Sequence, residues 1–341
     1  MGGILDTQIR SGKDIRELLK YYIGNSLAPN SPSKMQCTYE GSRIWEIDLR
    51  YRHGIFVNLN SESEFLDHVS DALSCCGAFD ISLSMDLESK NLSDSDWKNW
   101  FLDKVASKTM VVDTNFVIRH YFSSIIVPHF SKEELTKMSL QMPRMVILEI
   151  ERLGNAKENK HGKKHTSDNK LIEEKEKRIA FYATKEIYDL RKLVNYDLIP
   201  MYDPSSIVEF AEREGKGFGD AWIRKEIHDM IGHHHKGFDS EKIVLLTCDL
   251  MNSMAAEAEG LASCYFSRLP KSEFNLSGYE GQFSDFFVSN AVIFGAVNID
   301  LSASSGEIMD SFSVEGAWNG KTTSEWYSDS LRLKWRKISK R

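Results

Sequence analysis

The sequence predicts an α/β fold with three layers, in which helices cover both faces of a central parallel sheet. Three short apolar runs carry this prediction, at residues 110–112, 145–148 and 243–247. Each run is bounded by polar or turn-forming residues, as is typical of strands buried in a parallel sheet. Stretches with helical spacing lie between the runs, and strands that alternate with helices favour parallel pairing.

Length and composition describe a globular protein with more than one unit. At 341 residues the chain exceeds one typical domain, so we expect two or three units with an ample core. Hydrophobic residues make up 41% and charged residues 27%, which is ordinary for a soluble protein. The formal net charge of −7 argues against a chain that coats nucleic acid through bulk charge, while leaving room for a local basic surface.

The five cysteines argue against an oxidising compartment. They form no CxxC pair and no Cys/His zinc spacing, their number is odd, and Cys75 and Cys76 are adjacent, so a disulfide framework is not expected. No apolar run approaches the length of a membrane span, and the N-terminus lacks a signal-peptide core. We therefore expect a cytoplasmic protein.

Residues 1–107 predict a separate α+β domain. Helical spacing of apolar residues predicts helices at 14–23, 62–73 and 94–105. Alternation predicts strands at 44–49, 54–59 and 79–85, the second pairing with the first, and residues 25–33 predict a loop. No catalytic constellation is present here, so the role of this region stays open.

Residues 108–269 predict the central domain. After the strand at 110–112, helices are expected at 116–122 and 132–140, and Pro143 introduces the strand-like run at 145–148. A polar, glycine-containing loop at 154–170 leads into a long charged helix at 171–193. The remaining expected elements are strands at 198–202, 243–247 and 263–266 and helices at 206–214, 220–231 and 252–260.

Residues 270–341 change to Ser-, Gly- and aromatic-rich segments. Residues 284–294 fit a helix or a strand, 296–301 and 311–315 look extended, 316–321 predict a loop, and the tail 331–341 is basic. One interpretation is that this region is β-rich and packs on the N-terminal domain.

Four acids lie at the strand ends and helix starts of the central pattern. Asp113 follows the first strand, and Glu149 follows the apolar run after Pro143, where a helix is expected to begin. Asp220 lies in the first turn of a helix, and Asp249 follows the last long strand. Ligands of open α/β sheets bind beyond the carboxyl ends of the strands. We therefore expect the four acids to converge at one edge of the sheet.

The order and local contexts of these acids resemble the PIN-domain nuclease family, over roughly residues 108–269. The resemblance implies that Asp113, Glu149, Asp220 and Asp249 are catalytic residues and the ligands of Mg²⁺ or Mn²⁺. It also implies that Asn115 and Thr247, without binding the metal themselves, orient the ligands or a metal-bound water. The implied activity is endonucleolytic hydrolysis of single-stranded RNA that leaves a 5′-phosphate and a 3′-hydroxyl.

A metal ion also makes physical sense of this cluster. Clustered carboxylates repel one another unless a cation lies between them. Mg²⁺ and Mn²⁺ prefer oxygen ligands, and two such ions about 3.5–4 Å apart can activate a water and stabilise the leaving oxygen of a phosphodiester.

Each acid also has a purely structural interpretation. Asp113 and Asp220 can cap helices. Glu149 can favour a helix dipole, and Asp249 can form a turn.

Other polar segments carry weaker signals. Lys160, Lys163, Lys164 and His165 are candidates for holding a nucleic-acid backbone, although glutamates interleave with the basic stretch 157–178 and a solvated helix face explains it equally well. The run 233–235 of three histidines predicts a loop rather than a metal site. Residues 215–219 lack the spacing of a phosphate loop and predict a flexible lead into the helix of Asp220.

Two other functions stay open. One is a catalytically idle PIN-like module that binds RNA or acts as a scaffold, and the other is a structure-specific DNA nuclease. The chain carries about 100 residues before and about 70 after the central domain, which suggests substrate selection or a protein partner. PIN domains often pair, so a homodimer is a further candidate.

Overall fold

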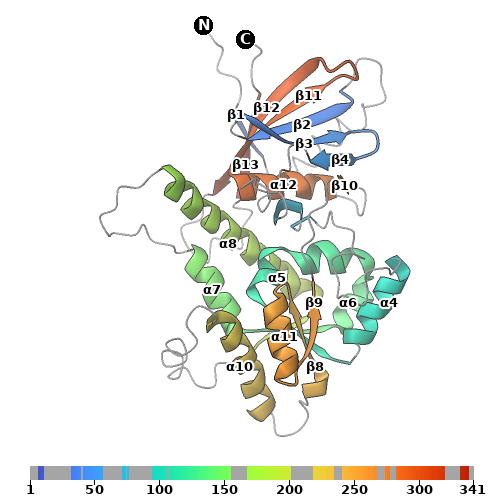
Figure 1. Cartoon of the computed structure of the whole chain (residues 1–341), viewed down its shortest axis with the longest axis vertical. Coiled ribbons are helices and arrows are strands. Elements are labelled where there is room, and N and C mark those ends of the chain that lie inside the picture. Colours follow the sequence, from blue (N-terminus) through green and yellow to red (C-terminus); the bar gives the residue numbers. More distant parts are fainter. Residues whose placement is uncertain are drawn as a thin grey trace. The chain divides into compact units, whose positions relative to one another are not determined.

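The computed structural model of the protein describes residues 7–10, 32–39, 41–56, 71–73, 75–76, 94–105, 107–154, 167–200, 218–233, 240–266, 273–276, 282–318 and 331–337. These residues form two compact units, each built on its own sheet (Figure 1).

The first sheet is the predicted parallel one. Its strands are β5 (Thr109–Val112), β6 (Ser139–Met142), β7 (Asn195–Leu198), β8 (Ile243–Thr247) and β9 (Ala262–Tyr265). They lie in the order β7-β6-β5-β8-β9, and every pair is parallel. β8 is buried along its whole length because helices flank the sheet. The predicted α/β fold of the central segment is confirmed.

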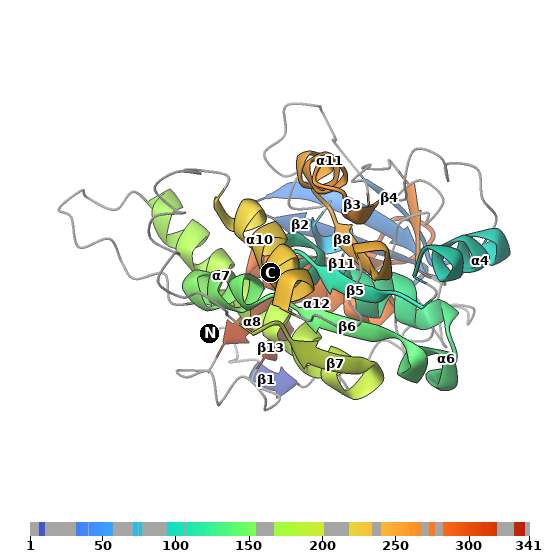
Figure 2. The same ribbon diagram turned by 90° about the horizontal axis from the view of Figure 1, so that it is seen from below.

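The first described helix of this unit precedes β5, and the others connect consecutive strands. They are α4 (Asp94–Val105), α5 (Thr114–Ile118), α6 (Lys132–Lys137), α7 (Arg144–Gly154), α8 (Ser167–Leu193) from Ala183 onward, α10 (Phe218–His233) and α11 (Leu250–Ala258). The described part of this unit also contains a π-helix, η2 (Phe122–Ile126), and the 3-10 turns η3 (Val127–His129) and η6 (Ser240–Lys242). Figure 1 shows α11 beside β8 and β9, and Figure 2 shows α7 beside α10.

The most consequential wrong prediction concerns residues 145–148. They form part of helix α7, and the strand lies earlier, at Ser139–Met142, where the end of a helix was expected. The buried residues of α7 include Val146, Ile150 and Gly154, which recur every four residues and so mark one face of a helix. Glu149 therefore projects from within a helix rather than from its start.

Other boundaries differ by a few residues. The helix expected at 116–122 is α5 followed by η2, and the strand expected at 198–202 is β7, which ends at Leu198. His233 is the last residue of α10 and not part of a loop. The expected helix at 206–214, the strand at 79–85, the helix at 14–23 and most of the helix at 62–73 lie outside the described residues.

The second sheet has eight strands and combines both ends of the chain. Its strands are β1 (Thr7–Arg10), β2 (Lys34–Tyr39), β3 (Ser42–Asp48), β4 (His53–Phe56), β10 (Glu273–Asn275), β11 (Ala296–Ser302), β12 (Ile308–Trp318) and β13 (Leu331–Lys337). Their order is β1-β13-β12-β11-β2-β3-β4-β10, and all pairs are antiparallel. Residues 316–318, expected in a loop, continue β12, and the first part of the basic tail forms β13.

The core of this unit lies where α12 (Gln282–Phe294) packs on the sheet. Trp45 of β3 is fully buried, contacts the rings of Phe286 and Phe287, and donates a hydrogen bond from Nε1 to Asn290 Oδ1 at 3.0 Å. The aromatic cluster therefore joins α12 to the sheet through both packing and one buried polar contact. Among the described helices of the chain, none combines the length and apolar character needed to cross a membrane.

Candidate active site

The candidate site begins where β5 and β8 end. The chain leaves β5 toward β6 on one side, while β8 pairs with the other side of β5, so this edge is the point where the strand order reverses. Asp113 directly follows β5 and is fully buried. Thr247, the last residue of β8, donates a hydrogen bond from Oγ1 to Asp113 Oδ2. The amide of Phe116 donates to Asp113 Oδ1 at 2.7 Å, so both oxygens of this carboxylate are held.

Asp249 lies two residues beyond β8 and is also held by backbone groups. Its Oδ1 accepts hydrogen bonds from the amides of Met251 at 2.7 Å and Asn252 at 3.2 Å, which makes it the N-cap of α11. The amide of Asp249 donates to Thr247 Oγ1 at 3.0 Å. Thr247 thus links the carboxylate after β5 to the backbone after β8.

Glu149 reaches the same edge from α7. Its Oε2 accepts a hydrogen bond from Thr114 Oγ1, the residue that follows Asp113. Its Oε1 lies against Gly219 of α10, where an added Cβ would clash with the oxygen. Glu149 can occupy this place only because residue 219 has no side chain.

Asp220 lies in the first turn of α10, directly after Gly219. Asn252 Nδ2 of α11 donates to its Oδ1 at 3.2 Å, and Arg224 donates to Asn252 Oδ1 at 2.7 Å. The pKa of Asp220 is raised to about 6, first by partial burial and then by the charges of Asp113, Asp249 and Glu149, with Arg224 opposing the rise. The four acids, called the acidic cluster below, are therefore close enough to act on one another electrostatically.

Burial also raises the pKa of Asp113. Removal from water raises the pKa of Asp113 to about 6, and this rise is opposed by the hydrogen bonds from Thr247 and Phe116 and by the nearby positive charge of Arg119. A fully buried carboxylate that repels its acidic neighbours is costly when ionised. A cation among the four carboxylates would relieve this cost.

The donor set fits Mg²⁺ or Mn²⁺ because all four groups are carboxylates. In the part of the chain that the structure describes, however, no three Asp, Glu, His or Cys side chains are placed close enough to coordinate one ion as they stand. The acids are neighbours at one edge of the sheet, and closing around an ion requires side-chain movement.

A fifth acid, Glu226 of α10, joins the helices that carry Glu149 and Asp220. It is buried in α10, and it accepts hydrogen bonds from Trp222 Nε1 at 3.0 Å and from the amide of Met145 at 3.4 Å. Burial raises the pKa of Glu226 to about 7, although these bonds and Arg144 oppose the rise. Met145 belongs to the first turn of α7, so Glu226 supplies that helix with a cap from a distant part of the chain.

Sequence reasoning missed several of these supporting residues. Thr114, Gly219, Glu226 and Asn252 carry no motif of their own, and their contacts appear only when distant segments meet. Asn115, expected to orient ligands, is the second residue of α5 and half-buried, and the hydrogen bonds found among the described residues do not join its side chain to the acids. Lys160, Lys163, Lys164 and His165 lie outside the described residues.

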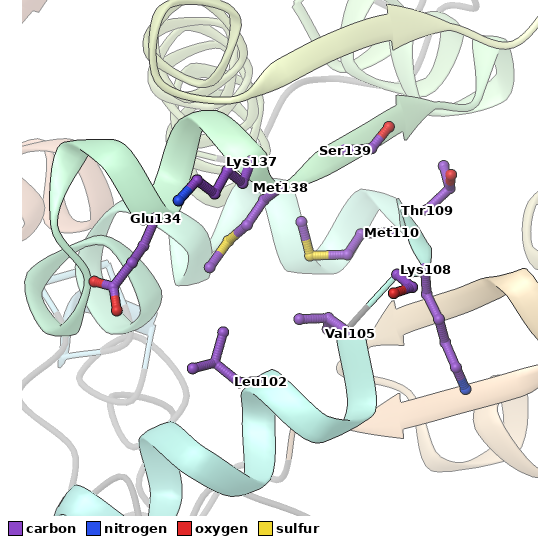
Figure 3. A pocket seen from close by; sticks show the side chains of 10 residues that line it. Leu102, Val105, Lys108, Thr109, Met110, Glu134, Lys137, Met138 and Ser139 are labelled. Carbon is purple, nitrogen blue, oxygen red and sulfur yellow. The ribbon is translucent and has the colours of Figure 1, made fainter.

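A cavity of about 410 Å³ lies at the other end of the same strands (Figure 3). Thr109 and Ser139, the first residues of β5 and β6, line it, and Met110 and Met138 point into it toward Leu102. Since the acids follow the last residues of β5 and β8, this largely apolar cavity is separate from the acidic cluster.

Comparison with protein families agrees with this architecture. Residues 110–267 match the model of the PIN domain family, which is a family of nucleases. The matched segment begins in β5 and includes all five strands of the parallel sheet and all four acids. Comparison with curated proteins found no match. The central segment of this chain, residues 110–267, is a PIN domain.

Proposed function

We propose that this protein is a metal-dependent endoribonuclease that hydrolyses phosphodiester bonds of single-stranded RNA at the acidic cluster. The observation that carries the proposal is that hydrogen bonds of Thr247, Thr114 and Asn252 bring four acids to one edge of the parallel sheet. The charges of the other three acids contribute to the raised pKa of Asp220, in keeping with this proximity. Four neighbouring acids that lack a basic partner each would lower the stability of the fold, and a fold with no functional need for them would not be expected to keep them. The membership of residues 110–267 in a nuclease family supports the same conclusion.

The chain's own residues orient the carboxylates. When bound, Mg²⁺ or Mn²⁺ would lower the pKa of an attacking water and neutralise charge on the phosphate oxygens. Thr247 and the amide of Phe116 fix Asp113, and Thr114 fixes Glu149. The amides that open α11 fix Asp249. These bonds hold the three carboxylates near the shared edge of the sheet before substrate binds, so the side-chain movement that closes them around an ion starts from fixed positions.

The remaining parts of the proposal concern the substrate, the cell compartment and the partners of the protein. Single-stranded RNA is chosen because the family resemblance points to it, with Lys160, Lys163, Lys164 and His165 as candidate backbone contacts. We place the protein in the reducing cytoplasm, a choice supported by the odd number and the burial of its five cysteines. The regions outside the PIN domain are candidates for contact with a protein partner or a second copy.

The first test is cleavage of a labelled single-stranded RNA by the purified full chain with Mn²⁺ or Mg²⁺, and then with EDTA. Asp249→Asn is the informative variant because asparagine also caps helices well, so α11 keeps its start. We expect EDTA to abolish cleavage and the variant to cleave more than about a hundredfold more slowly. A loss of that size exceeds what is typical when a residue that only supports a metal ligand is changed.

Asp229→Asn is the matched control. Asp229 lies on α10 and pairs with Lys225 at 2.5 Å, so the same chemical change removes a carboxylate of the same domain outside the acidic cluster. The control should cleave as the wild type does. Tight RNA binding without cleavage in any metal would instead support the idle module, and preferential cleavage of DNA flaps would support the DNA nuclease.

A further inference from the structure

Helix α11 places large apolar side chains in solvent and small or polar ones inside. Leu250, Met251 and Met254 are 44%, 71% and 55% exposed. The residues that α11 buries are Asn252, Ser253 and Ala256. This is the reverse of an ordinary amphipathic helix, whose apolar residues face the core.

Polar contacts explain why the inner face of α11 is not apolar. Asn252 bridges Asp220 and Arg224, as described above. Ser253 Oγ lies 2.7 Å from Ser263 Oγ of β9. The inner face therefore helps to build the acidic cluster and to attach α11 to the sheet. These contacts do not require the three apolar side chains on the outside, so that surface needs a separate explanation.

The three exposed residues form one surface beside the cluster. Residues 250 and 254 are four apart and residues 251 and 254 are three apart, spacings that bring side chains together on a helix. The amide of Met251 is 2.7 Å from Asp249 Oδ1, so the Met251 side chain begins next to a carboxylate of the cluster. We call Leu250, Met251 and Met254 the apolar platform.

We propose that the apolar platform contacts the bases of a single-stranded nucleic acid whose phosphate is held at the acidic cluster. The inference rests on the proposed function, since it assumes that a phosphodiester binds there. It adds a specificity-determining surface that the acids alone do not supply.

Three physical arguments favour bases as the occupant. A molecule bound at the acids must extend over the surface next to them, and the platform starts there. The carboxylates themselves do not attract a polyanion, so contacts away from the phosphate must provide affinity. Methionine sulfur interacts favourably with aromatic rings, and unbranched side chains adapt to different bases. Bases are free to make such contacts only when they are unpaired and unstacked, which agrees with a single-stranded substrate.

The test measures how tightly the full chain binds two labelled single-stranded RNAs of equal length. Binding is followed by fluorescence anisotropy in the presence of Ca²⁺. One strand carries ordinary bases, and in the other the central riboses are abasic. The variant is M251A/M254A, because alanine keeps helix propensity while removing both sulfur atoms. Ile308→Ala is the matched control, since Ile308 is also an exposed apolar residue but belongs to β12 of the other unit.

We expect the double variant to bind the strand with bases about tenfold more weakly, as two methionine–aromatic contacts would give. It should bind the abasic strand as the wild type does, and Ile308→Ala should bind both strands normally. Equal weakening on both strands, no weakening on either, or no RNA binding by the wild type would overturn the inference. So would self-association of the wild type in sedimentation that the double variant loses while its RNA affinity stays unchanged.

The same experiment separates this inference from the proposed function. Base-dependent binding through the platform without cleavage in Mn²⁺ or Mg²⁺ would support the platform and refute the nuclease. Metal-dependent cleavage by a double variant that binds both strands as the wild type does would support the nuclease and refute the platform.

Discussion

Glu149 lies directly against the backbone of Gly219, so closely that a Cβ on residue 219 would meet the Glu149 carboxylate. This relationship joins the helix that carries one acid of the cluster to the helix that carries another, since Asp220 follows Gly219. Glycine is therefore required here for a close approach and not for a left-handed backbone. The position of Glu149 depends on the absence of a side chain on a different helix.

The first prediction is that Gly219→Ala weakens Mn²⁺ binding without unfolding the protein. The methyl group displaces Glu149, and loss of support around a metal ligand typically costs ten- to a hundredfold in affinity. Titration calorimetry with Mn²⁺ measures the affinity, and thermal unfolding checks the fold. Gly232→Ala on the same helix is the control, since an added Cβ there meets nothing within 4 Å. Equal affinity of the two variants would show that Glu149 does not depend on Gly219.

The second prediction concerns the hydroxyl of Thr247. Thr247→Val keeps the shape of the side chain but removes the hydrogen bond to Asp113 Oδ2. We expect Mn²⁺ affinity to fall by roughly ten- to a hundredfold, because Asp113 is no longer held in place. Thr247→Ser keeps the hydroxyl and should restore most of the affinity. If serine binds Mn²⁺ as weakly as valine does, the hydroxyl is not the cause.

The third prediction is a pH dependence of stability that Glu226 produces. Its pKa is raised from an ordinary 4.5 to about 7, mainly by burial. A raised pKa means that Glu226 contributes stability that is complete below about pH 4.5 and is lost as pH rises through about 7. Glu226→Gln removes the titrating group, so above pH 7 the variant should gain on the order of 1–3 kcal/mol relative to the wild type.

Thermal unfolding of both proteins between pH 4.5 and 8 in metal-free buffer measures this difference. Asp113 and Asp220, with pKa values raised to about 6, add a pH dependence of the same sign to both proteins. The wild type and the variant should therefore diverge only through Glu226. Parallel curves across the whole range would contradict the prediction.

The fourth prediction concerns the other unit. Trp45→Phe leaves Asn290 Oδ1 buried without its donor, at a cost of about 1–3 kcal/mol in unfolding free energy. The double variant Trp45→Phe/Asn290→Leu should lose less than the sum of the two single variants, because it removes both partners of the bond. Urea unfolding of the four proteins measures the cycle. Strictly additive losses would mean that the bond contributes nothing.

The strands of the parallel sheet differed in how well the sequence revealed them. The strand Ile243–Thr247 was predicted with its observed bounds because four apolar residues in a row are bounded by polar ones, and the structure buries all five residues. Residues 145–148 were misread because a short apolar run fits a buried strand or a buried helix face equally well. The contact that favours the helix is the Glu226 cap on Met145, which comes from a distant segment and leaves no local signal.

The acids and their supports show the same contrast. Asp113 and Asp249 follow recognisable strands and Asp220 lies in the first turn of a helix, so their positions could be inferred from the order of elements. Glu149 lies within α7, and the family resemblance pointed to it although its helix was misread. Gly219 was predicted only to be part of a flexible segment before a helix, because its role depends on Glu149 lying against it. Thr114 is the neighbour of Asp113 in the sequence, but its side chain donates a hydrogen bond to Glu149. The start of the helix that carries Glu149 was mistaken for a strand. Supports of this kind are tertiary contacts, and a single sequence does not display them.

The pairing of the eight-stranded sheet has a consequence for the order of events during synthesis. All five strands of the parallel sheet lie between Thr109 and Tyr265, so they can find one another as soon as that stretch has left the ribosome. β1 has β13 as its only strand neighbour among the described residues, and β2 must wait for β11 to complete its pairing. The first strands to be made are therefore among the last to be matched, and until then their open edges are exposed to other chains. A chain truncated after the PIN domain would have all five strands of the parallel sheet, while its other sheet would lack four of its eight described strands.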